Sequence, residues 1–170
     1  MNQAKITLLL FVCLVIGFLL GLGIKYQYES TTFKPYSWGK PPAIVNCYGS
    51  KFNKEQMERA IEYWESRNYP VGFYEHDPPK SVCKNRWLDG FIILRESYSL
   101  PHSTIASTKR ISKYFEMKGA VIYYQPGAYN IYLINEHELG HALGFAHVDI
   151  PNHIMNPLYH NMGKDFFVPD

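Results

Sequence analysis

The stretch that decides the fold reads His137-Glu138-Leu139-Gly140-His141-Ala142-Leu143-Gly144-Phe145-Ala146-His147. His137 and His141 are four residues apart, so on a helix they lie one turn apart on the same face. Two imidazoles at this spacing can bind one Zn²⁺ ion. Gly144 permits the positive φ that ends a helix, so the chain can turn and bring His147 back as a third ligand. Three protein ligands leave a fourth position for water, as in catalytic zinc sites.

Glu138 directly follows the first of these histidines. Its carboxylate can take a proton from a metal-activated water, so we expect Glu138 to be a general base rather than a ligand. The pattern therefore predicts an endopeptidase that uses one catalytic Zn²⁺ ion and forms no covalent intermediate. The alternatives are a helix with incidental histidines, or a membrane-anchored zinc-binding interaction module without proteolytic turnover. A third class is a toxin-like or host-interfering peptidase with one dedicated protein substrate, which shares the chemistry. A module that only binds does not need a base beside its ligand.

The extended pattern H-E-x-x-H-x-x-G-x-x-H resembles that of the metzincin zinc peptidases, and the residues after it look like those of the matrixins. Met155, eight residues after His147, resembles the methionine of their Met-turn. The run Met155-Asn156-Pro157-Leu158-Tyr159 resembles the matrixin Met-x-Pro-x-Tyr run, whose proline and tyrosine wall the S1′ pocket. The resemblance thus implies that Pro157 and Tyr159 contact the residue after the scissile bond. It covers roughly residues 43–160.

Hydrophobic patterns upstream favour a layered domain of the α+β or α/β class, of which we predict α+β. They predict strands over residues 43–48, 71–75, 90–96, 103–108 and 120–124, helices over 54–67 and 131–143, and a loop over 77–87. The short alternating stretch 103–108 is the expected edge strand. The resemblance implies a metzincin-like catalytic domain: a twisted, mostly parallel sheet with an antiparallel edge strand, two main helices and an abbreviated C-terminal region. In that family the edge strand pairs with the bound peptide.

An uncharged apolar run, Ile6–Ile24, precedes the domain. Its 19 residues would span roughly 28 Å as a helix, about the thickness of a bilayer core. We therefore expect residues 1–24 to be a transmembrane anchor or a signal segment, 25–42 a linker, and 43–170 the zinc metallopeptidase domain. Lysines after the run favour a cytoplasmic domain. The position of the run, close to the N-terminus, favours export.

The cysteines support export. Cys13 lies in the apolar run, which leaves Cys47 and Cys83 in the domain. Two distant cysteines in a small exported domain predict one disulfide, although two unpaired, buried thiols are the alternative. The prediction is a single-pass membrane protein with its catalytic domain outside the cytoplasm, or a secreted protein if the leader is cleaved.

Charge and the other histidines complete the expectations. The formal net charge is +2 and no basic block occurs, so we expect no nucleic-acid partner. The expected partners are a peptide or protein substrate and, through the N-terminal segment, a membrane. The remaining histidines are expected at the surface or in loops: His76, His102, His153 and His160.

Overall fold

The sheet and helices follow one another in nearly the expected order. The computed structural model describes residues 37–168. The elements are β1 (Ala43–Asn46), α2 (Lys54–Glu65), β2 (Tyr74–Glu75), α3 (Lys80–Cys83), β3 (Phe91–Glu96), β4 (Ala106–Lys113), β5 (Glu116–Tyr124), η1 (Ala128–Asn130), α4 (Ile134–Leu143) and η2 (Tyr159–Asn161). The α+β class and the short C-terminal region agree with the sequence.

The five strands form one sheet in the order β2-β1-β3-β5-β4. The pairs β1–β2, β1–β3 and β3–β5 are parallel, and β4 pairs with β5 antiparallel. The prediction of a mostly parallel sheet with an antiparallel edge strand is therefore confirmed. The central strands are apolar and buried because the sheet is covered on both faces.

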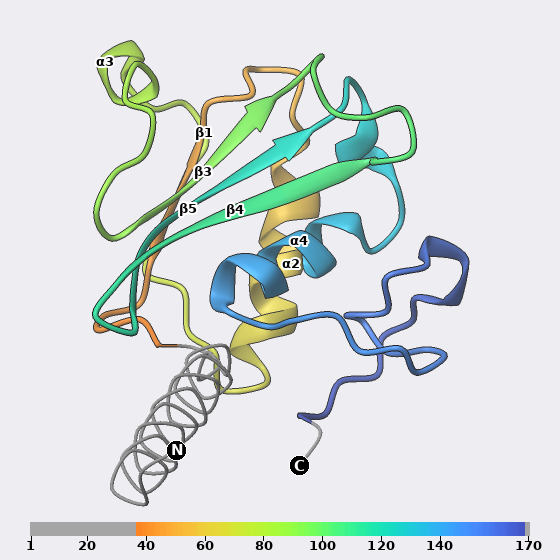
Figure 1. The fold of residues 1–170 in the computed structure, drawn as a ribbon. Helices are drawn as coiled ribbons and strands as arrows, with labels where there is room; N and C mark the ends of the chain where they lie inside the picture. Colours follow the sequence, from red (N-terminus) through yellow and green to blue (C-terminus); the bar gives the residue numbers. More distant parts are fainter. Residues whose placement is uncertain (1–36, 169–170) are drawn as a thin grey trace, which may run out of the picture. The chain divides into compact units, whose positions relative to one another are not determined.

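The two main helices, α2 and α4, lie on the same face of the sheet (Figure 1). The opposite face carries a small apolar cluster of Val45, Ile93 and Val121, against which Val82 and Leu88 pack. Since side chains alternate between the faces of a strand, neighbouring buried residues point toward the helices instead. Helix α4, which carries the histidine motif, thus packs on one face of the sheet, and this cluster covers part of the other face.

Trp64, near the end of α2, ties this helix to α4. Its ring is fully buried and stacks on Phe145 with 5.0 Å between ring centroids. Its indole N–H donates to the backbone carbonyl of Glu136 over 2.8 Å. At the other end of α2, the side chain of Asn53 caps the helix by accepting from the backbone N–H of Gln56.

Several boundaries differ from the prediction. The predicted loop 77–87 contains the short helix α3, and the predicted strand 71–75 is reduced to β2. The largest differences are at the sheet edge. The edge strand is Ala106–Lys113, later and longer than 103–108, and β5 begins at Glu116 instead of residue 120. The reason is a hairpin: Lys113 pairs with Glu116 across a two-residue turn, which extends both strands. The charged pair Lys109–Arg110 lies inside β4, because an edge strand tolerates charge.

The described chain begins beside the start of β5. The ring of Trp38 is buried, and its indole N–H donates to the carbonyl of Ala142 over 3.1 Å. Trp38 also forms a bridge with Met117. Within residues 37–168, no helix combines the length and the apolar character needed to cross a bilayer. The predicted leader, 1–24, lies outside the described residues.

The predicted disulfide between Cys47 and Cys83 is confirmed. The two Cα atoms are 5.4 Å apart and the bond joins positions 36 residues apart in sequence. It links the end of β1 to the end of α3, and Val82 packs on the apolar cluster beside it. The bond therefore holds the otherwise irregular segment around α3 against the sheet.

Removing this bond should destabilise the domain. A loop of this length contributes about 3–4 kcal/mol to stability in the chain-entropy model. We expect Cys47→Ser/Cys83→Ser to lower the free energy of unfolding by about that amount, measured by urea denaturation. Cys13→Ser, which leaves the pair intact, is the matched control. Equal stability of the double variant and the parent would contradict the structural role.

Candidate active site

Helix α4 carries two of the predicted ligands, His137 and His141, on its second and third turns. The helix ends at Gly144, which has φ of 110°, as the sequence requires. The backbone N–H of Phe145 donates back to the carbonyl of Gly140 at this turn. The chain is thereby redirected, and His147 returns toward the helix.

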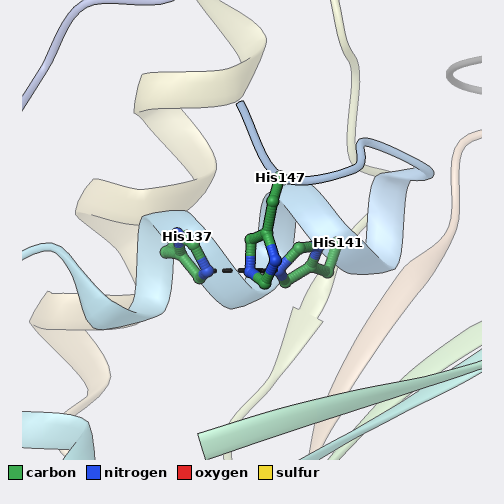
Figure 2. Close-up of side chains that lie close together, drawn as sticks. All are labelled: His137, His141 and His147. Atoms are coloured by element: carbon green, nitrogen blue, oxygen red, sulfur yellow. Dashed lines mark hydrogen bonds between the residues drawn. The ribbon is translucent and has the colours of Figure 1, made fainter. Parts of the chain in front are cut away.

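The three histidines that the motif predicts meet at one point (Figure 2). The Nε2 atom of His141 lies 3.1 Å from Nε2 of His137 and 3.0 Å from Nε2 of His147. Among residues 37–168 this is the only group of three metal-ligating side chains whose ligand atoms all lie within 4.8 Å of one another. The sequence-based prediction of which side chains converge is confirmed.

The opposite ring nitrogens fix the tautomers. Nδ1 of His137 is 2.8 Å from the carbonyl of Ile154, and Nδ1 of His141 is 2.8 Å from that of Phe145. A carbonyl can only accept, so both Nδ1 atoms carry the proton and both Nε2 atoms present a lone pair. Burial lowers the pKa of His137 to about 4 and that of His141 to about 3, with a contribution from the neighbouring imidazoles. Burial also lowers the pKa of His147.

This donor set fits a zinc ion. Lone pairs that face one another repel unless a cation lies between them, and neutral imidazole is the form that binds zinc. Two ligands at about 2.0–2.1 Å in a tetrahedral site lie roughly 3.3 Å apart, close to the spacing of these Nε2 atoms. Carbonyl partners on the far nitrogens orient the rings, as is usual for ligating histidines.

Glu138 is buried beside the triad and takes no part in it. Its Oε2 atom accepts a hydrogen bond of 2.6 Å from the Thr108 hydroxyl. Burial raises the pKa of Glu138 to about 7, and the bond from Thr108 partly opposes this. A carboxyl group with a pKa near neutrality can both accept and release a proton.

The contribution of Thr108 was not foreseen from the sequence. The alternation of a strand offers a signal once the strand is known: Ala106, Thr108 and Arg110 share one face of β4. That face is directed toward α4, since Arg110 donates to the carbonyl of Gly144. The helix residue that each side chain meets depends on how strand and helix are placed, which the pattern does not specify.

Met155 lies beneath the zinc-motif helix and is completely buried. A Cβ atom added to Gly140 would collide with its sulfur atom and with the ring of Trp64. The glycine in the motif therefore permits close packing of the helix between these two side chains. Met155 belongs to the core, as its predicted Met-turn position implies.

His153 was predicted at the surface or in a loop, and burial corrects the surface alternative: its exposed fraction is 0%. Its Nδ1 accepts from the backbone N–H of Met155 over 3.0 Å, and its Nε2 lies 2.9 Å from the carbonyl of Phe167. The imidazole thus joins the Met-turn to the C-terminal segment. His102 and His160 are exposed and His76 is half-buried.

A cavity of about 400 Å³ opens beside the triad. Its walls come from the start of β4, from the triad helix and from the segment after Met155. The lining includes Ala106, His137, Glu138, His147, Pro157, Tyr159 and His160. Pro157 and Tyr159 thus lie on its wall, while their S1′ role stays a prediction. A second cavity, of about 440 Å³, lies between α2 and the chain before α4, and none of the three histidines lines it.

Comparison with known proteins agrees with this geometry. The sequence profile of the matrixin family matches residues 46–169, well over half of the chain. No curated protein and no solved structure gives a significant match. The matched region contains the histidine triad, Glu138 and Met155. The chain therefore belongs to the matrixin family of zinc metallopeptidases.

Proposed function

We propose that this protein is an endopeptidase in which His137, His141 and His147 hold one zinc ion and Glu138 is the general base. The observation that carries the proposal is the position of Glu138. Glu138 is among the residues that line the cavity, together with His137 and His147, and a hydrogen bond from Thr108 orients its carboxylate. Base and metal ligands therefore face the same space.

The three imidazoles would hold a zinc ion, and its Lewis acidity would lower the pKa of water and polarise a peptide carbonyl. The Glu138 carboxylate takes the proton of the attacking water and passes it to the nitrogen of the departing amine. Thr108 holds the carboxylate during both transfers. No side-chain nucleophile is needed, so the reaction proceeds by direct attack of water.

We propose that the substrate binds along β4 as an extended peptide. Among the described strands β4 pairs with β5 alone, which leaves its other edge free to accept a strand. Ala106, at the beginning of β4, lines the cavity together with Glu138. Pro157 and Tyr159 would then contact the residue after the scissile bond.

We also propose that Ile6–Ile24 attaches the protein to a membrane and that the domain lies outside the cytoplasm. The uncharged length of this run supports the attachment. The disulfide between Cys47 and Cys83 supports an oxidising compartment.

Substitution of the base should separate catalysis from metal binding. Glu138→Gln keeps the shape of the side chain and removes its proton affinity, so we expect peptide cleavage to fall by about 10²–10⁴-fold. Zinc should remain at one ion per chain because the imidazoles are unchanged. Zinc content and cleavage of a peptide library measure both effects, and the library also reports the preference after the scissile bond.

His141→Ala is the matched variant, and it should lose metal as well as activity. Full activity of Glu138→Gln would exclude the proposed mechanism. A parent protein that binds zinc but cleaves no peptide or protein would favour the zinc-binding interaction module instead.

The Thr108 hydroxyl should affect turnover more than substrate binding. Thr108→Val keeps the branched side chain but leaves the carboxylate without its donor, so we expect kcat to fall about tenfold, as loss of one hydrogen bond to a charged group would cause. KM and zinc content should stay near the parent values. Thr108→Ser should restore kcat, and Ser107→Ala, on the opposite face of β4, should be silent. Equal kcat for the valine and serine variants would refute this role.

Removal of the metal should make the protein sensitive to acid. The folded pKa of His137 is about 4, below its ordinary value of 6.5, so below about pH 6.5 the unfolded chain binds more protons. The unfolding free energy should therefore fall as the pH drops toward 4, by up to about 1.4 kcal/mol per pH unit for each such histidine. Thermal unfolding of the chelated protein over this range measures the effect.

Glu138 acts in the opposite direction. Its pKa is raised from 4.5 to about 7, so between these values the folded state holds a proton that the unfolded chain lacks. Glu138→Gln should therefore make the acid-dependent loss steeper. A Tm of the chelated parent that does not change with pH would contradict the neutral, buried state of the imidazoles.

A further inference from the structure

The turn between β4 and β5 presents two aromatic side chains to solvent. Tyr114 is 85% exposed and Phe115 is 74% exposed. They are the two central residues of the hairpin turn, and their φ angles are 52° and 63°. Positive φ at both positions defines a type I′ turn, for which Asn-Gly is the usual sequence.

Aromatic residues are unfavourable at these positions. The left-handed region strains any side chain with a Cβ atom, and Asn and Gly tolerate it best. The burial of Tyr114 and Phe115 in the domain is too small to offset this strain. An uncommon backbone conformation combined with exposed apolar rings points to a role outside the domain.

The hairpin tip lies at the same end of the domain as the beginning of the described chain (Figure 1). The backbone N–H of Met117, two residues after the turn, donates to the carbonyl of Ser37 over 3.0 Å. Twelve residues, 25–36, separate Ser37 from the apolar run Ile6–Ile24. They can span at most about 40 Å, so a membrane that holds the run lies within reach of the tip.

We propose that Tyr114 and Phe115 insert into the interface of the lipid bilayer that holds Ile6–Ile24. The inference rests on the proposed attachment to a membrane. Aromatic rings are favoured at the level of the lipid headgroups. Lys113, whose ammonium nitrogen lies 5.2 Å from the centre of the Tyr114 ring, can extend to the phosphates beside it.

This contact would set the distance between the candidate active site and the membrane surface. From Thr108 to Tyr114 the chain advances six residues, or about 20 Å along a strand. The carboxylate of Glu138, which Thr108 contacts, would therefore lie within roughly 20 Å of the membrane. The substrate class that follows is the stalk of membrane-anchored proteins close to the point where they leave the bilayer.

Depth measurement on the full chain tests the contact. The variants Ser112→Cys and Ser99→Cys, each in a Cys13→Ser background, are labelled at the new cysteine with an environment-sensitive dye. Each is bound to phosphatidylcholine/phosphatidylserine vesicles that contain a spin-labelled lipid, which quenches a dye that lies close to the bilayer. Ser112 adjoins the tip, whereas Ser99 follows β3 at the opposite end of the sheet, where Ser97 bonds to Tyr124. We expect the dye at position 112 to be quenched at least threefold more than the dye at 99.

The matched variant is Tyr114→Asn/Phe115→Gly, which removes both rings and suits the turn better, so the fold is retained. It should abolish the difference in quenching. It should also lower cleavage of a vesicle-anchored peptide at least fivefold while cleavage of the same peptide in solution is unchanged. Tyr98→Ser, another exposed tyrosine, is the control and should change neither.

Each contrary result has a distinct meaning. Vesicle-bound protein with equal quenching at both positions overturns the proposal, and so does a full chain that does not bind vesicles. Slower cleavage of a soluble folded protein by the tip variant, without quenching, would identify a protein partner instead. If no peptide is cleaved by any form, the proposed peptidase function fails, while the quenching still decides the membrane contact.

Discussion

The active site depends on two hydrogen bonds from imidazole to backbone. Nδ1 of His137 donates to Ile154, in the segment of the Met-turn, and Nδ1 of His141 donates to Phe145, just beyond the end of α4. Each bond fixes a tautomer and a ring orientation together, so the lone pairs of Nε2 converge on one point. The site therefore requires the helix, its terminating turn and the Met-turn to be in place at once.

The packing beneath α4 explains how these parts are held. Gly140 lets the helix approach Trp64 and Met155 more closely than any side chain would permit. Trp64 in turn stacks on Phe145, whose carbonyl orients His141. Because such close-packed contacts cannot shift without loss of packing energy, the core fixes the position of the His141 ring. The packing contacts that stabilise the domain are therefore largely the contacts that set the geometry of the site.

Sequence reasoning succeeded where spacing determines geometry. The four-residue step from His137 to His141 fixes a helix face, and Gly144 fixes the turn, so the triad could be predicted. It did not predict the contacts of Thr108 and His153, because tertiary packing determines the partners of these side chains. Thr108 meets Glu138 only because β4 lies beside α4, and His153 is buried only because the C-terminal segment covers it. The extent of β4 was also missed, since aromatic residues in a type I′ turn give no ordinary turn signal.

Strand β4 forms one edge of the sheet and connects the candidate active site to the hairpin tip. Its inward face contacts Glu138, the proposed base, through Thr108, its free edge is the proposed site for the peptide, and its far end carries Tyr114 and Phe115. A register shift between Ile111 and Ser112 separates the half of the strand that contacts Glu138 from the tip. Because such irregularities bend and twist a strand locally, the tip can be aimed independently of the residues that face α4. Strand β4 can thus support the proposed catalytic role of Glu138 at one end and the proposed membrane contact at the other.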